Sequence, residues 1–189
     1  GTSILAHEFE QELSQALGSD LVRKAKQLNS LLSIIPEASI ASEDGGVTAM
    51  HDITEGGILG ACFEMSSPEN GYCIDLDCVP LLDETKLICQ YFGIDPYRLI
   101  SSGSLLIAAD DGHALVKKCM SSGIQAAVIG KIQKGDSCTI EKGGHVVALS
   151  SPKPDELYSA SSRLTPSKLK TVLFVCTGNT CRSPMAEAL

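Results

Sequence analysis

The sequence has no tryptophan, only 4% aromatic residues, and no apolar run approaching the roughly 20 residues that a membrane-spanning helix needs. Its longest apolar stretches are LLSII and LLIAA, so we expect no membrane partner. A basic region followed by an apolar segment, typical of a secretion signal, is also missing from the start. Because the eight cysteines form no short secreted framework, these absences together predict a cytoplasmic protein with reduced thiols.

Basic charge is scarce over most of the chain. Fifteen lysines and arginines face 23 acidic residues, which gives a net charge of −8. From Tyr158 onward the balance reverses, with four basic residues against one acid, so the larger part is strongly acidic. Because no basic stripe with interleaved aromatic residues is present, we expect no nucleic-acid partner.

Apolar periodicity predicts helices alternating with strands. Helical spacing covers 4–17 and 20–35, with Ser19 as the cap of the second helix and Pro36 as its end. Another helix should carry Ile58, Leu59, Cys62 and Phe63, and the remaining elements are helices at 83–93 and 112–123 and strands at 47–50, 72–77, 103–109, 126–132, 137–141 and 145–149. Adjacent strands near the end favour antiparallel pairing. The pattern predicts an α/β (α+β) fold, a mixed sheet covered by helices.

A change of composition divides the chain. Residues 150–170 hold six serines and three prolines, which is typical of a linker. We therefore expect a main domain over 1–157, a Ser/Pro-rich linker over 158–170 and a short C-terminal extension over 171–189.

The segment HDITEGG precedes an apolar helix and offers a candidate phosphate site. Asp52 and Thr54 supply polar side chains, and Gly56 and Gly57 leave backbone N–H groups uncovered at the positive end of the helix dipole. Taken alone, the pattern favours an ordinary capped helix start with a glycine turn. His51, at the end of the strand, is interpreted as a structural hydrogen-bonding residue, with acid/base chemistry as the alternative.

The histidines and cysteines do not predict a metal site. The other three histidines are isolated in the sequence, and no pair has the spacing of metal ligands. Cys73 and Cys78 lie too far apart for a zinc knuckle and are expected to be buried free thiols.

Several motifs in order carry a resemblance to a known superfamily. VTAMHDITEGGILGACFEM, then FGIDPYRLISSGSLLIAA, then AAVIGKI and DEL, over residues 1 to about 157, resemble the C-terminal domain of the aminoimidazole ribonucleotide (AIR) synthetase superfamily. The superfamily includes a hydrogenase maturation factor, formylglycinamidine synthase, selenophosphate synthetase and thiamine monophosphate kinase. The sequence is most similar to the hydrogenase maturation and related-protein branch.

The resemblance implies ATP-dependent chemistry that activates an oxygen by phosphorylation, with Asp52, Thr54, Gly56 and Gly57 contacting phosphate. It also implies that a preceding domain supplies most magnesium ligands, the nucleotide loop and a homodimer interface. ATP and Mg are therefore expected in a longer parent protein, which would bind ATP or a small phosphorylated ligand through that domain. Because this chain starts at GTSILA, we expect a fragment that is inactive alone, without a tightly bound cofactor.

The last residues contain a second motif of a different chemistry. Cys176 and Arg182 enclose five residues, TGNTC, and Ser183 follows, between an apolar strand pattern and a helix start. Such a loop can surround a phosphoryl group with backbone N–H donors while Arg182 binds two of its oxygens and Cys176 attacks phosphorus as a thiolate. Ser183 can donate a hydrogen bond to that thiolate.

VLFVCTGNTCRSPMAEAL resembles the start of low-molecular-weight protein phosphatases, and the resemblance implies that Cys176 is the nucleophile and Cys181 a protecting thiol. Thr180 is similar to members that act on phosphoarginine. In that family an Asp-Pro general acid lies far downstream, whereas Asp95-Pro96 lies upstream and fits the first family's pattern. The loop is therefore expected to be a remnant. The alternative function is a piece of a tyrosine or arginine phosphatase fusion.

Overall fold

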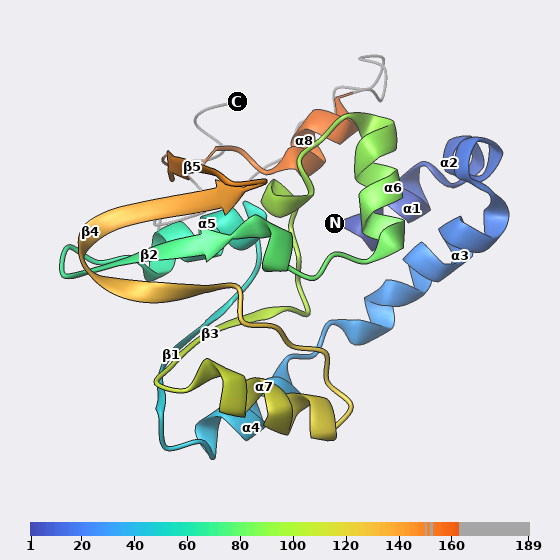
Figure 1. The fold of residues 1–189 in the computed structure, drawn as a ribbon. Helices are drawn as coiled ribbons and strands as arrows, with labels where there is room; N and C mark the ends of the chain where they lie inside the picture. Colours follow the sequence, from blue (N-terminus) through green and yellow to red (C-terminus); the bar gives the residue numbers. More distant parts are fainter. Residues whose placement is uncertain (150, 152, 163–189) are drawn as a thin grey trace, which may run out of the picture.

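The computed structural model describes residues 1–149, 151 and 153–162 (Figure 1). Within these residues, no helix combines the length and the apolar character needed to cross a membrane. In Figure 1, α1, α2, α3 and α6 lie on the right, the strands β2, β4 and β5 lie on the left together with α5, and α4 and α7 lie at the bottom near β1 and β3.

The element order confirms most of the predicted alternation. The helices are α1 (Thr2–Glu8), α2 (Glu10–Leu17), α3 (Ser19–Gln27), α4 (Ile35–Ser42), α5 (Gly57–Met65), α6 (Asp83–Phe92), α7 (Gly112–Ser121) and α8 (Glu156–Ser161). The strands are β1 (Val47–Asp52), β2 (Asn70–Asp75), β3 (Leu105–Ala109), β4 (Gly130–Lys142) and β5 (His145–Ala148). Short 3₁₀ turns are η1 (Leu28–Leu31), η2 (Leu76–Cys78) and η3 (Pro96–Arg98).

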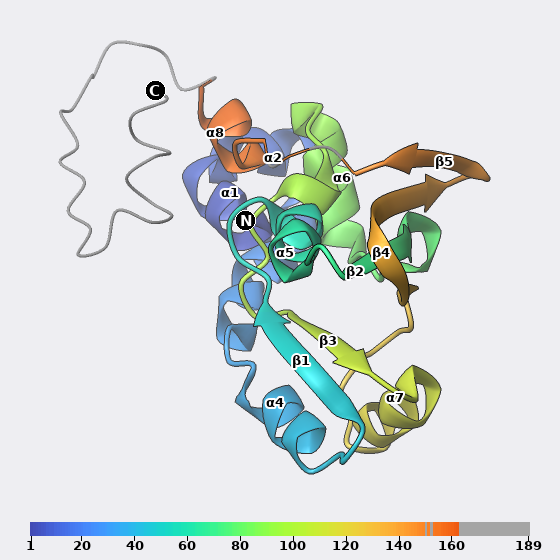
Figure 2. The same ribbon diagram turned by 90° about the vertical axis from the view of Figure 1, so that its left-hand side faces the viewer.

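The strands form two sheets, and the predicted class, a mixed α/β fold covered by helices, is confirmed. β1 and β3 make an antiparallel pair in which Asp52 lies opposite Leu105. The second sheet has the order β2-β4-β5, with β2 parallel to β4 and β4 antiparallel to β5 as expected for adjacent strands. Figure 2 shows α4 and α7 on one side of the β1-β3 pair and most other helices beyond its opposite end.

Two apolar clusters stabilise the domain. The first joins α1, α2, α3, α6 and α8, with Leu5, Leu13 and Ile88 fully buried and the ring of Phe9 edge-on to Phe92 at 4.8 Å between centroids. The second packs α5 against β2 and β4. The segment around η3 belongs to both clusters, because Tyr97 lies in the second and Leu99 in the first. The position of α5 is therefore tied to the packing of the N-terminal helices.

The N-terminal helices begin and end at residues other than those predicted from the sequence. The first expected helix is divided at Phe9, whose backbone leaves helical geometry (φ −111°, ψ 29°) while its ring packs on Phe92. Ser19 does not cap α3: it is the first helical residue, and Gly18 occupies the capping position without a side-chain bond. Pro36 opens α4 rather than ending α3, since its fixed φ and missing N–H suit a first helical turn.

The C-terminal strands and helix also differ in detail. The two strands expected at 126–132 and 137–141 form one continuous strand, β4, which starts only at Gly130. Helix α8 lies within the segment whose serine and proline content predicted a linker. Asp155 caps this helix, and Ala160 is 1% exposed in the first apolar cluster. Tertiary burial of one alanine and a capping carboxylate therefore order a segment of linker-like composition.

Candidate functional site

The predicted phosphate turn lies between β1 and α5. After Asp52 ends β1, the N–H of Ile53 donates to the carbonyl of Ser104 at 3.0 Å, and the N–H of Gly57 donates to the carbonyl of Thr54 at 3.1 Å. The structure thus brings together two motifs that are about 50 residues apart, HDITEGG and the SSGS turn before β3. This pairing places the four predicted residues at one end of the β1-β3 pair.

Gly56 and Gly57 both adopt left-handed backbone conformations, with φ of +79° and +61°. A Cβ atom on Gly57 would lie 2.6 Å from the carbonyl oxygen of Tyr97 and 2.8 Å from that of Leu99. The glycine therefore has a packing role, because it lets α5 begin against the backbone around η3. Gly60, one turn later, makes a similar close approach, with its Cβ position 2.9 Å from the carbonyl oxygen of Glu55.

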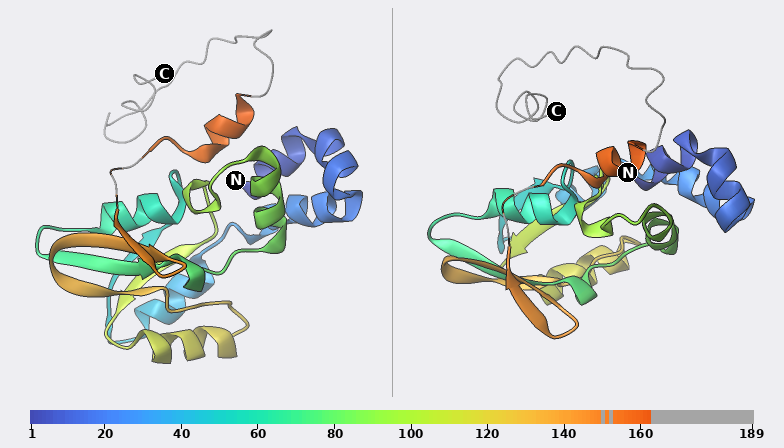
Figure 3. Two further views of the ribbon diagram at one scale, coloured as in Figure 1. Left: turned by 45° about the horizontal axis from the view of Figure 1, so that its top comes forward. Right: turned by 90° about the horizontal axis from the view of Figure 1, so that it is seen from above.

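The buried carboxylate of Asp155, from the other end of the domain, hydrogen-bonds to the turn on the side that faces the protein interior. Asp155 is 2% exposed; its Oδ2 accepts a hydrogen bond from the N–H of Gly56 at 2.7 Å, and its Oδ1 accepts one from the N–H of Leu157 at 2.8 Å. One side chain thus satisfies backbone donors at the starts of α5 and α8. In both views of Figure 3, α8 lies between α5 and the N-terminal helices. No role for Asp155 was predicted from the sequence, although an aspartate before a short apolar pattern is a helix-capping signal.

The outward side of the turn carries the other polar groups. The Asp52 side chain is 61% exposed, and Thr54 is half-buried. His51 lies beside them, with Nε2 3.0 Å from a carboxylate oxygen of Glu64 and Nδ1 2.6 Å from the backbone oxygen of Asp52. These contacts support the structural interpretation of His51. The N–H groups of Gly56 and Gly57 are both hydrogen-bonded within the domain, so the expectation that they are uncovered was wrong. The groups left for a ligand at the start of α5 are the exposed Asp52 carboxylate and the half-buried Thr54.

The described residues do not provide a complete metal site. No group of three or more histidine, cysteine or acidic side chains with suitable geometry exists among them. Asp52 alone cannot hold Mg²⁺, which needs near-octahedral oxygen coordination. The turn therefore fits a phosphate contact, whereas a magnesium ion would depend on ligands from elsewhere.

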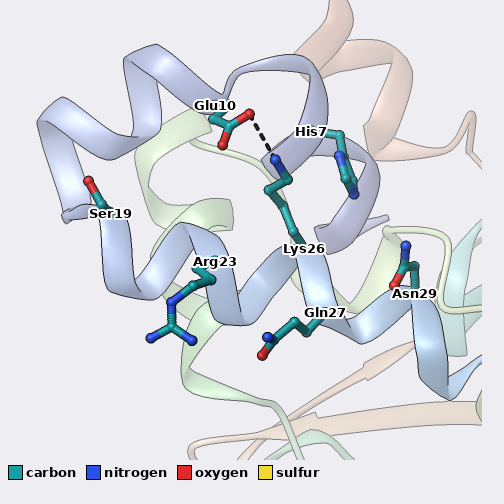
Figure 4. Close-up of a pocket in the computed structure, with 7 residues that line it drawn as sticks. All are labelled: His7, Glu10, Ser19, Arg23, Lys26, Gln27 and Asn29. Atoms are coloured by element: carbon teal, nitrogen blue, oxygen red, sulfur yellow. Dashed lines mark ion pairs between the residues drawn. The ribbon is translucent and has the colours of Figure 1, made fainter.

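A pocket lies away from this turn, among α1, α2 and α3 (Figure 4). Its volume is about 520 Å³, and it is lined by His7, Glu10, Ser19, Arg23, Lys26, Gln27 and Asn29. Lys26 is paired with Glu10 at 2.8 Å, and Arg23 is paired with Asp20 at 3.1 Å. Because both cations already have acidic partners, the pocket offers no unpaired positive charge to an anionic ligand.

The thiols are in different environments. Cys62 and Cys89 are buried, and burial raises the pKa of each to about 12. Cys78 is exposed and Cys73 only half-buried, so the expectation that these two are buried was wrong. The Cys78 thiol donates to Asp75, and this hydrogen bond raises its pKa. None of these three perturbed thiols has the lowered pKa of a nucleophile.

The remaining predicted site residues, Cys176, Arg182 and Ser183, lie outside the described residues. Asp95, which was rejected as a general acid because of its place in the sequence, caps η3 by accepting a hydrogen bond from the N–H of Tyr97 at 3.0 Å. Its role is therefore structural.

The fold and the glycine turn together describe one class of protein. It is a mixed α/β domain in which α5, the helix that follows β1, starts at a turn of two glycines. Residues 1–143 match the family model described as AIR synthase related protein, C-terminal domain. Because this match covers well over half of the sequence, the chain belongs to that family. Residues 171–189 match the model of low molecular weight phosphotyrosine protein phosphatase.

Individual relatives agree with the family assignment. The chain is 26% identical over 139 residues to the carbamoyl dehydratase HypE of Rhizobium leguminosarum bv. viciae, covering 68% of this chain and 39% of the relative. The structure of E. coli HypE, a hydrogenase maturation protein, has a TM-score of 0.56 at 23% identity over 63% of this chain and 40% of that one. A HypE structure solved in complex with ATP has a TM-score of 0.52 at 22% identity, over 59% and 37%. The chain thus spans about two fifths of the length of these proteins.

Proposed function

We propose that the chain is the C-terminal half of an ATP-dependent enzyme of the carbamoyl dehydratase type, acting in hydrogenase maturation or a related reaction. The observation that carries the proposal is the turn from Asp52 to Gly57, where two glycines in left-handed conformations start α5 beside an exposed carboxylate. The family membership and the named HypE relatives support it. In this proposal the domain supplies one wall of a nucleotide site.

The start of α5, Thr54 and Asp52 have distinct proposed roles. The start of α5 presents the positive end of a helix dipole, which favours a phosphate group. Thr54 would donate its hydroxyl hydrogen bond to a phosphate oxygen. Asp52, being exposed, would contribute one oxygen ligand to a magnesium ion whose other ligands come from outside this chain. ATP, when bound, supplies a phosphoryl group that converts a substrate oxygen into a leaving group.

The parent enzyme is proposed to be a homodimer that binds ATP mainly through a further domain. The present residues alone are proposed to lack activity, since the described part of the chain contains no group of side chains that could hold a metal ion. We also propose the division into a main domain over 1–157, a linker over 158–170 whose first residues belong to α8, and an extension over 171–189.

The test is an NMR titration of the 189-residue chain with ATP and Mg²⁺. We expect millimolar affinity, with amide shifts concentrated at residues 52–57. Asp52→Asn and Thr54→Val should each weaken binding several-fold, whereas Asp136→Asn, an exposed change on β4, should not. Shifts confined to the pocket around Arg23 and Lys26 would refute the proposed site.

A second candidate function rests on the match of residues 171–189 to the low-molecular-weight phosphatase model. In this alternative, the protein is part of a phosphatase fusion acting on phosphotyrosine or phosphoarginine, with Cys176 as nucleophile, Arg182 binding the phosphoryl oxygens and Ser183 bonding the thiolate. If no general acid assists the leaving group, we expect a rate lower by roughly two to four orders of magnitude.

Alkylation of Cys176 by iodoacetamide across pH tests this alternative together with hydrolysis of an aryl phosphate. If the loop is a remnant, Cys176 should react with the pH dependence of an ordinary thiol. A thiolate already formed at pH 6, with hydrolysis abolished by Cys176→Ser, would instead establish a working phosphatase site.

A further inference from the structure

The buried carboxylate of Asp155 has no part in the function proposed above, yet it contacts the turn on which that function rests. It lies 99 residues after Gly56 in the sequence and is among the largest fully buried side chains. Its two oxygens accept from two different helix starts. We propose that Asp155 is a positioning residue: acting through the Gly56 N–H, it holds the turn of residues 54–57 in the conformation that contacts phosphate.

The geometry favours positioning over direct contact with a ligand. Asp155 is 2% exposed, whereas the Asp52 side chain on the outward face is 61% exposed. A phosphate group arriving from solvent therefore meets Asp52 and Thr54, not Asp155. The Gly56 N–H points inward and is already used by the carboxylate, so the ligand must use other groups of the turn.

Two consecutive glycines make such a constraint necessary. Gly56 and Gly57 have no Cβ atoms to restrict their backbone, so their left-handed conformations depend on outside contacts. Gly57 is held from one side by the backbone around Tyr97. Gly56 is held from the other side by a 2.7 Å bond to a carboxylate oxygen in a buried setting, where hydrogen bonds are strong.

The same carboxylate couples the turn to the C-terminal segment. Helix α8 has only six residues, too few to be stable alone, and relies on its cap and on the burial of Ala160. If phosphate binding orders the turn, it must by linkage stabilise the docking of α8 as well. The inference that phosphate affinity depends on Asp155 rests on the proposed function, whereas the positioning of the turn does not.

The experiment compares amide hydrogen exchange of the 189-residue chain with Asp155→Ala, Asp155→Asn and Asp111→Ala. Asp111 is the matched control, because it caps α7 through the N–H of Ala114 at 2.9 Å and has no contact with the turn. In Asp155→Ala we expect the Gly56 amide to exchange roughly tenfold faster, in proportion to the loss of a helix cap. Asp155→Asn, which keeps one acceptor oxygen, should restore part of the protection, and Asp111→Ala should leave Gly56 unchanged.

A titration with ATP and Mg²⁺ on the same proteins measures the consequence for binding. We expect the shifts at residues 52–57 to require roughly tenfold more ATP in Asp155→Ala and an unchanged concentration in Asp111→Ala. Equal exchange at Gly56 in all four proteins would overturn the positioning role. If exchange changes as expected but ATP shifts none of residues 52–57 even in the unaltered chain, the proposed function fails and positioning by Asp155 stands. If Asp155→Ala does not fold, Asp155→Asn alone is compared with the unaltered chain.

Discussion

Gly57 lies so close to Tyr97 that a Cβ atom on the glycine would be 2.6 Å from the tyrosine carbonyl oxygen. The contact joins the start of α5 to the segment that links the two apolar clusters. Gly93 has a similar φ of +67° but open space at its Cβ position. Replacing each of the two glycines therefore separates the cost of a left-handed backbone from the cost of a steric clash.

Gly57→Ala should therefore destabilise the protein more than Gly93→Ala. At Gly93 we expect only the cost of a left-handed alanine, about 1 kcal/mol. At Gly57 the clash with backbone adds to that cost, for a total of about 2–4 kcal/mol. Urea unfolding monitored by circular dichroism measures both. Equal losses at the two positions would show that the backbone around Tyr97 moves away freely.

Removing α8 should destabilise the domain. A chain of residues 1–162 retains Asp155 and the buried Ala160, and we expect it to be as stable as the 189-residue chain. A chain of residues 1–152 loses the cap of α5 and the contacts of α8 with the first apolar cluster, at a cost of about 2–4 kcal/mol. Identical urea midpoints for the two shortened chains would contradict the contribution of α8.

The boundary of the folded domain should be visible in limited proteolysis. We expect the protease to cut the 189-residue chain first within the predicted linker, after Ser162.

The buried thiols should resist alkylation in the folded protein. With a pKa of about 12, Cys62 and Cys89 have a thiolate fraction of roughly 10⁻⁴ at pH 8, and burial blocks the reagent as well. We expect iodoacetamide to label the exposed Cys78 before either of them, with peptide mass spectrometry reading the order. Rapid labelling of Cys89 in the absence of denaturant would show that the N-terminal cluster opens readily.

The same two pKa values predict a loss of stability at alkaline pH. A thiol whose folded pKa is raised stays protonated in the native state while the unfolded chain begins to ionise near the ordinary value of 9.0. The stability is therefore intact below pH 9 and falls as the pH rises toward 12. Cys62→Ala and Cys89→Ala chains should each show a shallower fall in urea midpoint between pH 9 and 11. An unchanged slope in both variants would contradict the raised pKa values.

The ion pair between Asp44 and Lys118 should contribute to stability in a pH-dependent way. The hydrogen bond from Lys118, on α7, lowers the pKa of the Asp44 carboxyl below its ordinary value of 3.8. Because the folded pKa is the lower one, this stabilisation is present above pH 3.8 and is lost as the pH falls through the folded value. Lys118→Met should lower the thermal midpoint at pH 6, with the difference shrinking toward pH 2. A difference that persists at pH 2 would mean that packing, not charge, accounts for the loss.

Local patterns in the sequence were enough to predict most elements and the class of the fold. The apolar run before α7 predicts β3, and helical spacing predicts α6, because each pattern reports which face of one element is buried. The double glycine after β1 likewise predicted a turn at the start of α5, and the motifs over residues 1–157 indicated the family. These features depend on neighbours within a few residues, so no knowledge of the packing was needed.

Tertiary structure alone decided the features that join distant segments. Composition could not show that the helices break at Phe9, whose ring packs against Phe92 more than 80 residues later. Nor could it show that a serine- and proline-rich segment forms α8, since a six-residue helix is stable only when Ala160 is buried and Asp155 finds its donors. The bond from Gly56 to Asp155 exists because the packing of two apolar clusters brings their backbones together, and no local pattern specifies that distance.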